Sequence, residues 1–261
     1  MIDETSRAQL QESWQEPFAR GRFVEAHKYY LLREVKDPEV LHALDNLAEL
    51  EALVRSKSWN QALRRLGRLE SPPDLLPWDE LAEQLSSLKA SSASLDRRRP
   101  EEALAELETV NLPCLEAEVL AQRGTAQIFL NNLDEAEELF RKAIDLDPRH
   151  YRALTNLGNV ALEQGRVDEA IASYQAALKI NSEFGNAHHN LGVAYRRKGQ
   201  VSKSVRSLRK AQRALGRKDR EDARAELSER TRTQGTKLLR WVGYGIVAVI
   251  VYFVLRNRGI L

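Results

Sequence analysis

Apolar residues recur along most of the chain at the three- and four-residue spacing of an amphipathic α-helix. This spacing predicts one helix over residues 151–164 and a second over residues 167–180. Gly165 is expected in the turn between them, because glycine can end a helix at a positive φ. The alternation of apolar and polar residues that is typical of strands is absent. The pattern therefore predicts an all-α protein built from pairs of helices.

The helix pair recurs with a period of 34 residues, in copies over residues 117–150, 151–184 and 185–218. Four positions of the copy keep their size, namely a glycine, a small residue, a bulky residue and an alanine: Gly124, Gly158, Gly192; Ala136, Ala170, Ser204; Phe140, Tyr174, Leu208; Ala143, Ala177, Ala211. We expect the small residues to let paired helices approach closely while the bulky ones fill the space beside them. Because small, bulky and turn positions recur together, a solenoid is favoured over an ordinary helical bundle.

These residues resemble the tetratricopeptide repeat (TPR), whose signature includes Leu-Gly, an aromatic residue, then alanine, an aromatic residue, alanine and finally proline. The clearest matches are Leu157-Gly158, Ala170, Tyr174, Ala177, Leu191-Gly192, Tyr195, Phe140 and Pro148. Three residues depart from the signature: Arg123 replaces the leucine, Ser182 the proline and Ser204 an alanine. The resemblance implies a right-handed TPR solenoid that binds peptides or assembles proteins, and it implies no particular partner.

Residues 1–116 carry fainter versions of the same pattern and are predicted to form degenerate TPR-like helical pairs. The second helices of three such pairs are marked by Ala26 with Tyr30, Ala62 with Leu66 and Leu69, and Ala103 with Leu107 and Val110. The alanines are unequally spaced, which indicates connecting loops of different length, such as the proline-rich residues 71–77. The alternative is a separate helical domain that ends near Pro113.

Charge divides the chain unequally although the net charge is only +2. Residues 1–195 hold 22 Lys and Arg against 33 Asp and Glu, whereas residues 196–240 hold 16 against 5. An acidic body thus leads into a basic segment, of which residues 219–237 are predicted to be a basic capping helix and stem. Nucleic-acid binding is disfavoured, because no aromatic residue that could stack on a base lies between Tyr195 and Trp241.

The most apolar part of the chain follows this basic stem. Residues 238–255 are predicted to form a transmembrane helix, which would extend roughly 27 Å and so approach the thickness of a bilayer core. Apolar residues occupy every face of it, whereas a helix that merely caps the solenoid, the alternative, needs a polar outer face. Predicted membrane residues are Trp241, Gly243, Ile246, Val249, Ile250, Phe253 and Leu255.

Only the short basic tail of residues 256–261 would lie beyond this anchor. The chain begins with acidic residues in place of a basic leader, so we expect the N-terminal domain to stay in the cytoplasm. Lys and Arg collect on the cytoplasmic side of membranes, and the basic juxtamembrane stem would attract anionic lipid. The excess of Arg over Lys, 29 against 11, favours a bacterial cytoplasmic membrane, with the mitochondrial outer membrane as the alternative.

In the TPR fold, the first helices of successive repeats line a concave groove, and the resemblance places the partner-binding residues there. They are Arg152, Thr155, Asn156, Asn159, Asn186, His189, Asn190, Arg196 and Arg197. Asparagine can both donate to and accept from a peptide backbone, and arginine can pair with a carboxylate. Some family members bind the C-terminal carboxylate of chaperones. Asn159 and Asn190 match that set, but Thr155 stands where its first lysine is expected.

We expect no enzyme activity, no cofactor and no metal site. Cys114 is the only cysteine, and neither a nucleophile–base pair nor a phosphate loop is present. His188 and His189 are adjacent, so on a helix they point about 100° apart and make a poor metal site. The function predicted from these features is a membrane-anchored scaffold that binds a segment of another protein. The alternative is a self-associating structural or membrane-remodelling factor.

Overall fold

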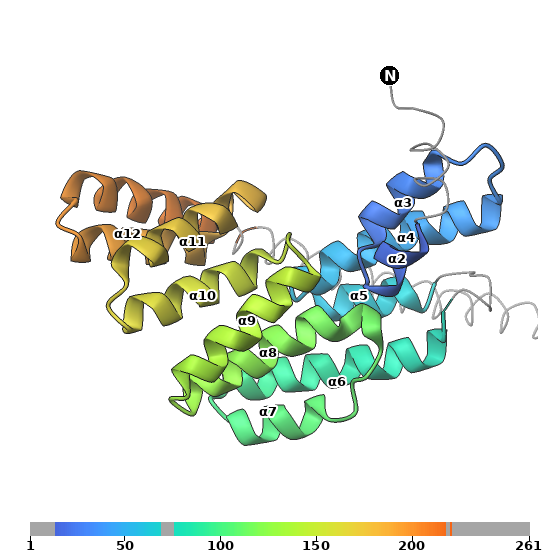
Figure 1. The fold of residues 1–261 in the computed structure, drawn as a ribbon, viewed down its shortest axis with the longest axis horizontal. Coiled ribbons are helices and arrows are strands. Elements are labelled where there is room, and N and C mark those ends of the chain that lie inside the picture. The colour runs from blue at the N-terminus through green and yellow to red at the C-terminus, as the bar shows by residue number, and fades with distance from the viewer. Residues whose placement is uncertain (1–13, 69–75, 218–219, 221–261) are drawn as a thin grey trace, which may run out of the picture.

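The computed structural model describes residues 14–68, 76–217 and 220, and all regular structure within them is helical, as predicted (Figure 1). Its helices are α2 (Gln15–Ala19), α3 (Phe23–Leu31), α4 (Pro38–Arg55), α5 (Trp59–Leu66), α6 (Trp78–Asp96), α7 (Pro100–Leu107), the short 3-10 helix η1 (Pro113–Leu115), α8 (Glu116–Phe129), α9 (Leu133–Leu146), α10 (Tyr151–Glu163), α11 (Val167–Ile180) and α12 (Gly185–Arg197). Residues 201–217 are helical as well.

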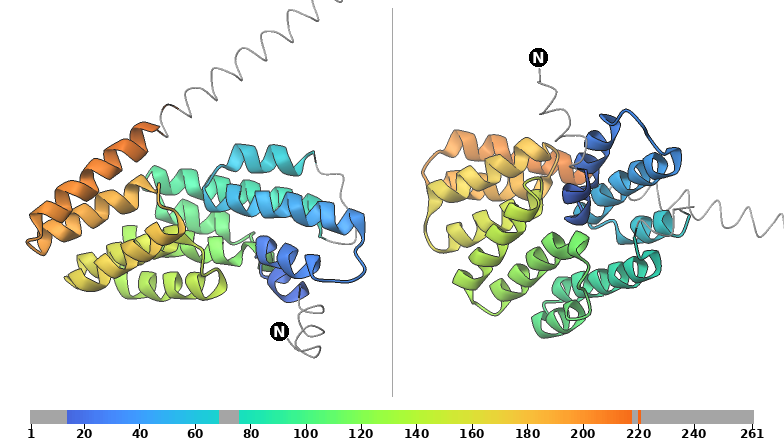
Figure 2. Two further views of the ribbon diagram at one scale, coloured as in Figure 1. Left: turned by 90° about the horizontal axis from the view of Figure 1, so that it is seen from above. Right: turned by 45° about the vertical axis from the view of Figure 1, so that its right-hand side comes forward.

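The helices form antiparallel pairs that stack on their neighbours in chain order, so the molecule is a curved two-layer solenoid (Figures 1 and 2). The three repeats correspond to α8 with α9, α10 with α11, and α12 with the helix over residues 201–217. Gly165 and Gly199 occupy the turns inside the second and third repeats with φ of 78° and 77°, and Asn131 takes a φ of 64° in the first. The predicted turn therefore needs a residue that tolerates a left-handed backbone.

The recurring glycines and bulky residues interlock, which confirms the predicted close approach of paired helices. A Cβ added to Gly158 would lie 2.6 Å from Cε1 of Tyr174, and one added to Gly124 would lie 2.8 Å from Cε1 of Phe140. Both aromatic rings are fully buried. The third repeat uses Leu208, whose Cγ would be 2.8 Å from a Cβ on Gly192.

The N-terminal helices also pack through small buried residues. The alanines of α3, α5 and α7 (Ala26, Ala62 and Ala103) are fully buried. One continuous core extends from Trp14 in the N-terminal pair to Val119 in α8. The core therefore crosses Pro113 without a break within the described residues. Leu69, the last apolar residue of the second N-terminal pattern, lies outside them.

The predicted C-terminal features lie outside the described residues. These are most of the basic capping helix and stem, the membrane segment 238–255 with Trp241, Gly243, Ile246, Val249, Ile250, Phe253 and Leu255, and the basic tail 256–261. Among the helices that the structure does describe, none combines the length and the apolar character that a bilayer crossing requires.

Candidate functional site

A cavity of about 300 Å³ lies between α8, α10 and α12, the first helices of the three repeats. Seven of the nine predicted groove residues line it: Arg152, Thr155, Asn156, Asn159, Asn186, His189 and Asn190. Residues from other parts of the chain complete the wall, notably Lys57 from the turn between α4 and α5, Glu118 and Gln122 from α8, and Leu215 from the helix over residues 201–217. The cavity is thus bounded by four helix pairs.

A row of side-chain amides runs across this cavity from one repeat to the next. The Asn156 amide donates to Thr125 Oγ1 (3.1 Å), Asn159 donates to Asn156 Oδ1 (3.4 Å), and Asn190 donates to Asn159 Oδ1 (2.7 Å). Tyr174 holds the middle of the row, because its hydroxyl donates to Asn159 Oδ1 at 2.9 Å. Burial raises the pKa of Tyr174, so this hydroxyl keeps its proton. The amides are therefore oriented before any partner arrives.

The remaining predicted groove residues differ in whether their polar groups already make hydrogen bonds within the protein. Thr155 is buried, and its hydroxyl donates to the carbonyl oxygen of Tyr151 at 2.8 Å. Asn186 and His189 are exposed at the mouth of the cavity. Arg196 and Arg197 lie outside the cavity lining, and Arg197 donates to the Leu162 carbonyl near the end of α10 at 2.7 Å. That carbonyl oxygen also accepts from the backbone N–H of Gly165 at 3.2 Å, so Arg197 adds a side-chain donor to the C-terminal end of α10.

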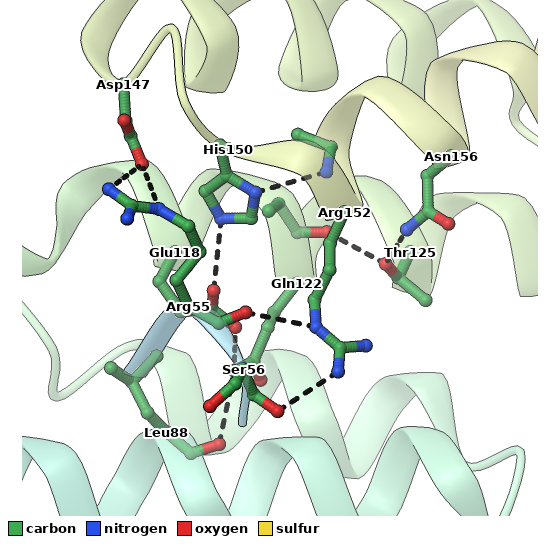
Figure 3. Close-up of polar contacts among 12 residues, drawn as sticks. Arg55, Ser56, Leu88, Glu118, Gln122, Thr125, Asp147, His150, Arg152 and Asn156 are labelled. Atoms are coloured by element: carbon green, nitrogen blue, oxygen red, sulfur yellow. Dashed lines mark hydrogen bonds and ion pairs between the residues drawn. The ribbon is translucent and has the colours of Figure 1, made fainter. Parts of the chain in front are cut away.

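Arg152 closes one end of the cavity by joining α10 to α4. Its Nε and Nη2 donate to the carbonyl oxygens of Arg55 (3.1 Å) and Ser56 (3.0 Å), which are the last groups of α4 (Figure 3). Its guanidinium also lies 5.1 Å from the ring centre of Phe184. A cation at a helix C-terminus is stabilised by the helix dipole and by the unpaired carbonyls. The contact connects residues almost 100 positions apart.

A buried acid and a buried histidine form the floor of the cavity. His150 Nδ1 accepts a hydrogen bond from the backbone N–H of Ala153 (3.1 Å), so the ring carries its hydrogen on Nε2, which donates to Glu118 Oε2 at 3.1 Å (Figure 3). The other oxygen of Glu118 accepts from Gln122 Nε2 at 2.9 Å. The arrangement makes His150 a hydrogen-bond donor to a buried carboxylate.

These donors keep Glu118 ionised. Burial would raise the pKa of Glu118, but the hydrogen bond and the electrostatic interaction with His150, the charge of nearby Lys57 and the hydrogen bond from Gln122 together lower it below its ordinary value. The carboxylate therefore stabilises the fold at pH values above its unfolded-state pKa, and this contribution is lost as the pH falls through the lower folded-state value. Burial lowers the pKa of Lys57 despite the neighbouring charge of Glu118.

Arg55 forms a second buried network beside the first. Its guanidinium pairs with Glu51 on the preceding turn of α4 and with Asp147 Oδ2, at 3.0 Å from Nη2 and 3.1 Å from Nε. The two ion pairs raise the pKa of Arg55 although burial opposes them. Asp147 lies in the loop between α9 and α10, so this pair fixes the N-terminal helices to the start of the second repeat.

Sequence reasoning missed Glu118, Gln122, Lys57 and His150. Glu118 and Gln122 hold the second and sixth positions of the first copy, the same positions as Arg152 and Asn156 in the next. Extending the groove register to residues 117–150 would have found both. No comparable signal marks Lys57, which adopts a φ of 58° in a turn far from the repeats.

The described residues contain no group of three or more metal-ligating side chains. His188 and His189 face different sides of α12, since His189 lines the cavity and His188 bonds to the Ser182 carbonyl. Burial raises the pKa of Cys114 to about 12, so the thiol stays protonated and unreactive at neutral pH.

Comparison with known proteins bears on the repeats. Residues 121–184 and 187–224 match two tetratricopeptide repeat family models. The chain therefore contains TPR repeats, as the sequence predicted. No curated protein matches the chain in sequence.

Several solved structures are similar to this chain. A crystal structure of MamA is 22% identical, with a TM-score of 0.44 over 66% of this chain and 96% of MamA. MamA from Desulfovibrio magneticus RS-1 is 27% identical, with a TM-score of 0.42 over 51% of this chain and 75% of that one. YrrB, a TPR protein with an unusual peptide-binding site, is 17% identical, with a TM-score of 0.40 over 80% of this chain and 99% of YrrB.

Proposed function

We propose that the protein is a membrane-anchored TPR scaffold, rather than an enzyme, that binds an extended segment or a helix of another protein in the cavity between α8, α10 and α12. The observation that carries this proposal is the row of Asn156, Asn159 and Asn190 across the cavity. A peptide backbone presents N–H and C=O groups in turn, and an amide side chain can pair with either.

The row keeps capacity for a partner although its members bond to one another. Each amide nitrogen has two hydrogens and makes one hydrogen bond, and Asn190 Oδ1 accepts none within the described residues. These side chains are already ordered by their hydrogen bonds. Binding therefore costs less side-chain conformational entropy than it would if the side chains were mobile before the partner bound. Two further lining residues, Lys57 and Arg152, add positive charge beside the row.

Exchanging Asn156 and Asn190 together for alanine tests the cavity. The affinity for the partner, followed as recovery in a crosslinking pull-down from native membranes, is expected to fall roughly thirtyfold, because two hydrogen-bonding groups are lost at roughly 1 kcal/mol each. Asn159 and Arg197 are kept, because they hold Tyr174 and the Leu162 carbonyl. The matched control exchanges two exposed amides away from the cavity, Asn60 and Gln212, for alanine. Equal recovery from the double variant and the control would refute binding in the cavity, provided that all three proteins unfold at the same temperature.

Membrane attachment is supported by the apolar residues 238–255 and by the helix over residues 201–217, which carries six Lys and Arg and no Asp or Glu. We expect the full chain to resist extraction of membranes with alkaline carbonate, and a chain that ends at residue 237 to appear in the soluble fraction. The N-terminal domain would then face the cytoplasm of a bacterium, with the mitochondrial outer membrane as the other candidate. Release of the full chain by carbonate would exclude a spanning anchor.

A further inference from the structure

Lys57 brings an ammonium group without a bonded partner into the wall of the cavity between α8, α10 and α12. It lies in the turn after α4 and is half-buried, and no hydrogen bond or ion pair joins it to another described residue. Glu118 interacts with it electrostatically, but the two oxygens of Glu118 already accept from His150 and Gln122. The three N–H groups of Lys57 therefore remain available to an acceptor that a ligand supplies.

Arg152 supplies a second available donor beside Lys57. Its Nε and Nη2 are held by the carbonyl oxygens at the end of α4, whereas its Nη1 donates to no described residue (Figure 3). Burial lowers the pKa of Lys57, and the charge of Arg152 acts in the same direction against the opposing charges of Glu118 and Asp96. A carboxylate that accepted from both cations would offset their repulsion, whereas a neutral carbonyl would satisfy a donor without balancing the charge.

The amide row beside these cations discriminates poorly between peptide sequences. Asn156, Asn159 and Asn190 can pair with backbone N–H and C=O groups, and nearly every residue of a peptide presents both. The row therefore suits a peptide backbone of almost any sequence. Selection between partners by charge falls to Lys57 and Arg152, which are fixed beside the row by the end of α4.

A second hollow adjoins the cavity and gives a bound chain room to continue. Its volume is about 380 Å³, and it shares Arg152, Phe184, Asn186 and Leu215 with the cavity lining. Leu215 is 40% exposed at this junction. A segment that lies along the amide row can therefore pass over Phe184 and Leu215 into the hollow, so its chain does not have to end beside Lys57. This arrangement suits the side chain of an internal residue.

We propose that Lys57, together with Nη1 of Arg152, selects partner segments that carry an aspartate or glutamate side chain. The carboxylate of that side chain accepts from both cations while the neighbouring backbone pairs with the amide row. This inference rests on the proposed binding of a protein segment in the cavity, and it states which segments the cavity accepts. The selecting residue comes from a turn outside the three repeats.

Selection from a displayed library of random dodecapeptides on the full chain in detergent tests the inference. The peptides are joined to the display particle through their C-terminal ends, so only side chains supply carboxylates. One enriched position is expected to hold aspartate or glutamate, and Lys57→Glu is expected to replace that preference with lysine or arginine. Lys57→Arg and the control Lys89→Gln, an exposed cation of α6 outside the cavity lining, should both keep the acidic preference. An acidic preference that survives Lys57→Glu would reduce the effect to net charge and overturn the proposal.

Synthetic copies of an enriched peptide, amidated at the C-terminus, measure the contact by fluorescence anisotropy. Exchanging the acid of the peptide for its amide is expected to weaken binding to the unaltered chain about tenfold, as for one charge-assisted hydrogen bond. The same exchange should have a much smaller effect on binding to Lys57→Gln, because the pair is already broken. Equal effects on both chains would refute the role of Lys57. If Lys57→Gln fails to fold, unchanged binding of the amide peptide to the unaltered chain still refutes it.

Two further comparisons decide between related outcomes. Tighter binding of a peptide whose carboxylate is its free C-terminus would show that a chain end occupies the site and would overturn the assignment of a side chain. Peptides that bind the variant with Asn156→Ala and Asn190→Ala as tightly as the unaltered chain would refute binding in the cavity and the present inference together. Peptides that need both amides but show no acidic preference would refute the role of Lys57 alone.

Discussion

Replacing Arg55 with leucine is expected to lower the free energy of unfolding by roughly 3–5 kcal/mol, the usual cost of removing one partner from a buried ion pair. Arg55 is the shared partner of Glu51 and Asp147, whose side chains are only 9% and 13% exposed. Without the guanidinium, two carboxylates remain in a poorly hydrated site with no other cation bonded to them among the described residues. Urea denaturation at neutral pH measures the loss.

Two comparisons separate this effect from a general effect of removing charge. Lys142→Leu breaks an exposed pair with Glu138 on α9 and should cost less than about 1 kcal/mol. Adding Glu51→Gln and Asp147→Asn to Arg55→Leu should recover part of the loss, because neutral amides are less costly to bury than unpaired carboxylates. A loss from Arg55→Leu no greater than that from Lys142→Leu would contradict the buried network.

Gly158→Ala is expected to destabilise the protein by roughly 1–3 kcal/mol, the cost of overpacking a core. At an unhindered helical position the same change would be favourable by about 1 kcal/mol. Here the new Cβ would lie 2.6 Å from the ring of Tyr174. That ring is fully buried, and its hydroxyl is held by Asn159, so it cannot move aside without breaking the amide row as well.

Gly216→Ala provides the matched control on the helix over residues 201–217. The nearest atom to its added Cβ is an arginine nitrogen, Nη2 of Arg220, at 3.9 Å. This change is therefore expected to leave the melting temperature unchanged or to raise it, whereas Gly158→Ala lowers it. A Gly158→Ala protein that melted at or above the temperature of the unaltered chain would show that the helices of the second repeat can separate freely.

Local rules account for the parts of the fold that the sequence predicted. The predicted helix over residues 167–180 agrees with α11, and that over residues 151–164 ends one residue beyond α10, because Gly165 and the apolar spacing act over a few residues. The same holds for the interlocking glycines and rings, whose positions follow from the repeat. The contacts of Arg55 with Asp147 and with Arg152 could not be predicted from local rules. They depend on the small rotation of each helix pair relative to the next, which accumulates along the solenoid.

The candidate site shows the same limit. Positions near the middle of the first helices were placed in the cavity by the repeat register, whereas Arg196 and Arg197 come at the end of α12, beyond the cavity wall. Lys57 entered the wall only because the solenoid curves far enough to bring the turn after α4 onto α8 and α10. The position of a residue within the repeat determines whether its side of the helix faces the cavity. The curvature of the solenoid determines which residues from distant helices lie opposite it.

The bond between Arg152 and the end of α4 has a mechanical consequence. An open solenoid extends and recoils as a spring, because each repeat contacts only its neighbours. Here Arg152 and the Arg55–Asp147 pair connect two points along the spring that are separated by more than 90 residues. Tension applied between the ends of the molecule would pass through this tie first, so the intervening helices would carry no load until it broke. The part of the cavity wall formed by α8 and α10, which lies between the tied points, would thus keep its shape until the tie broke.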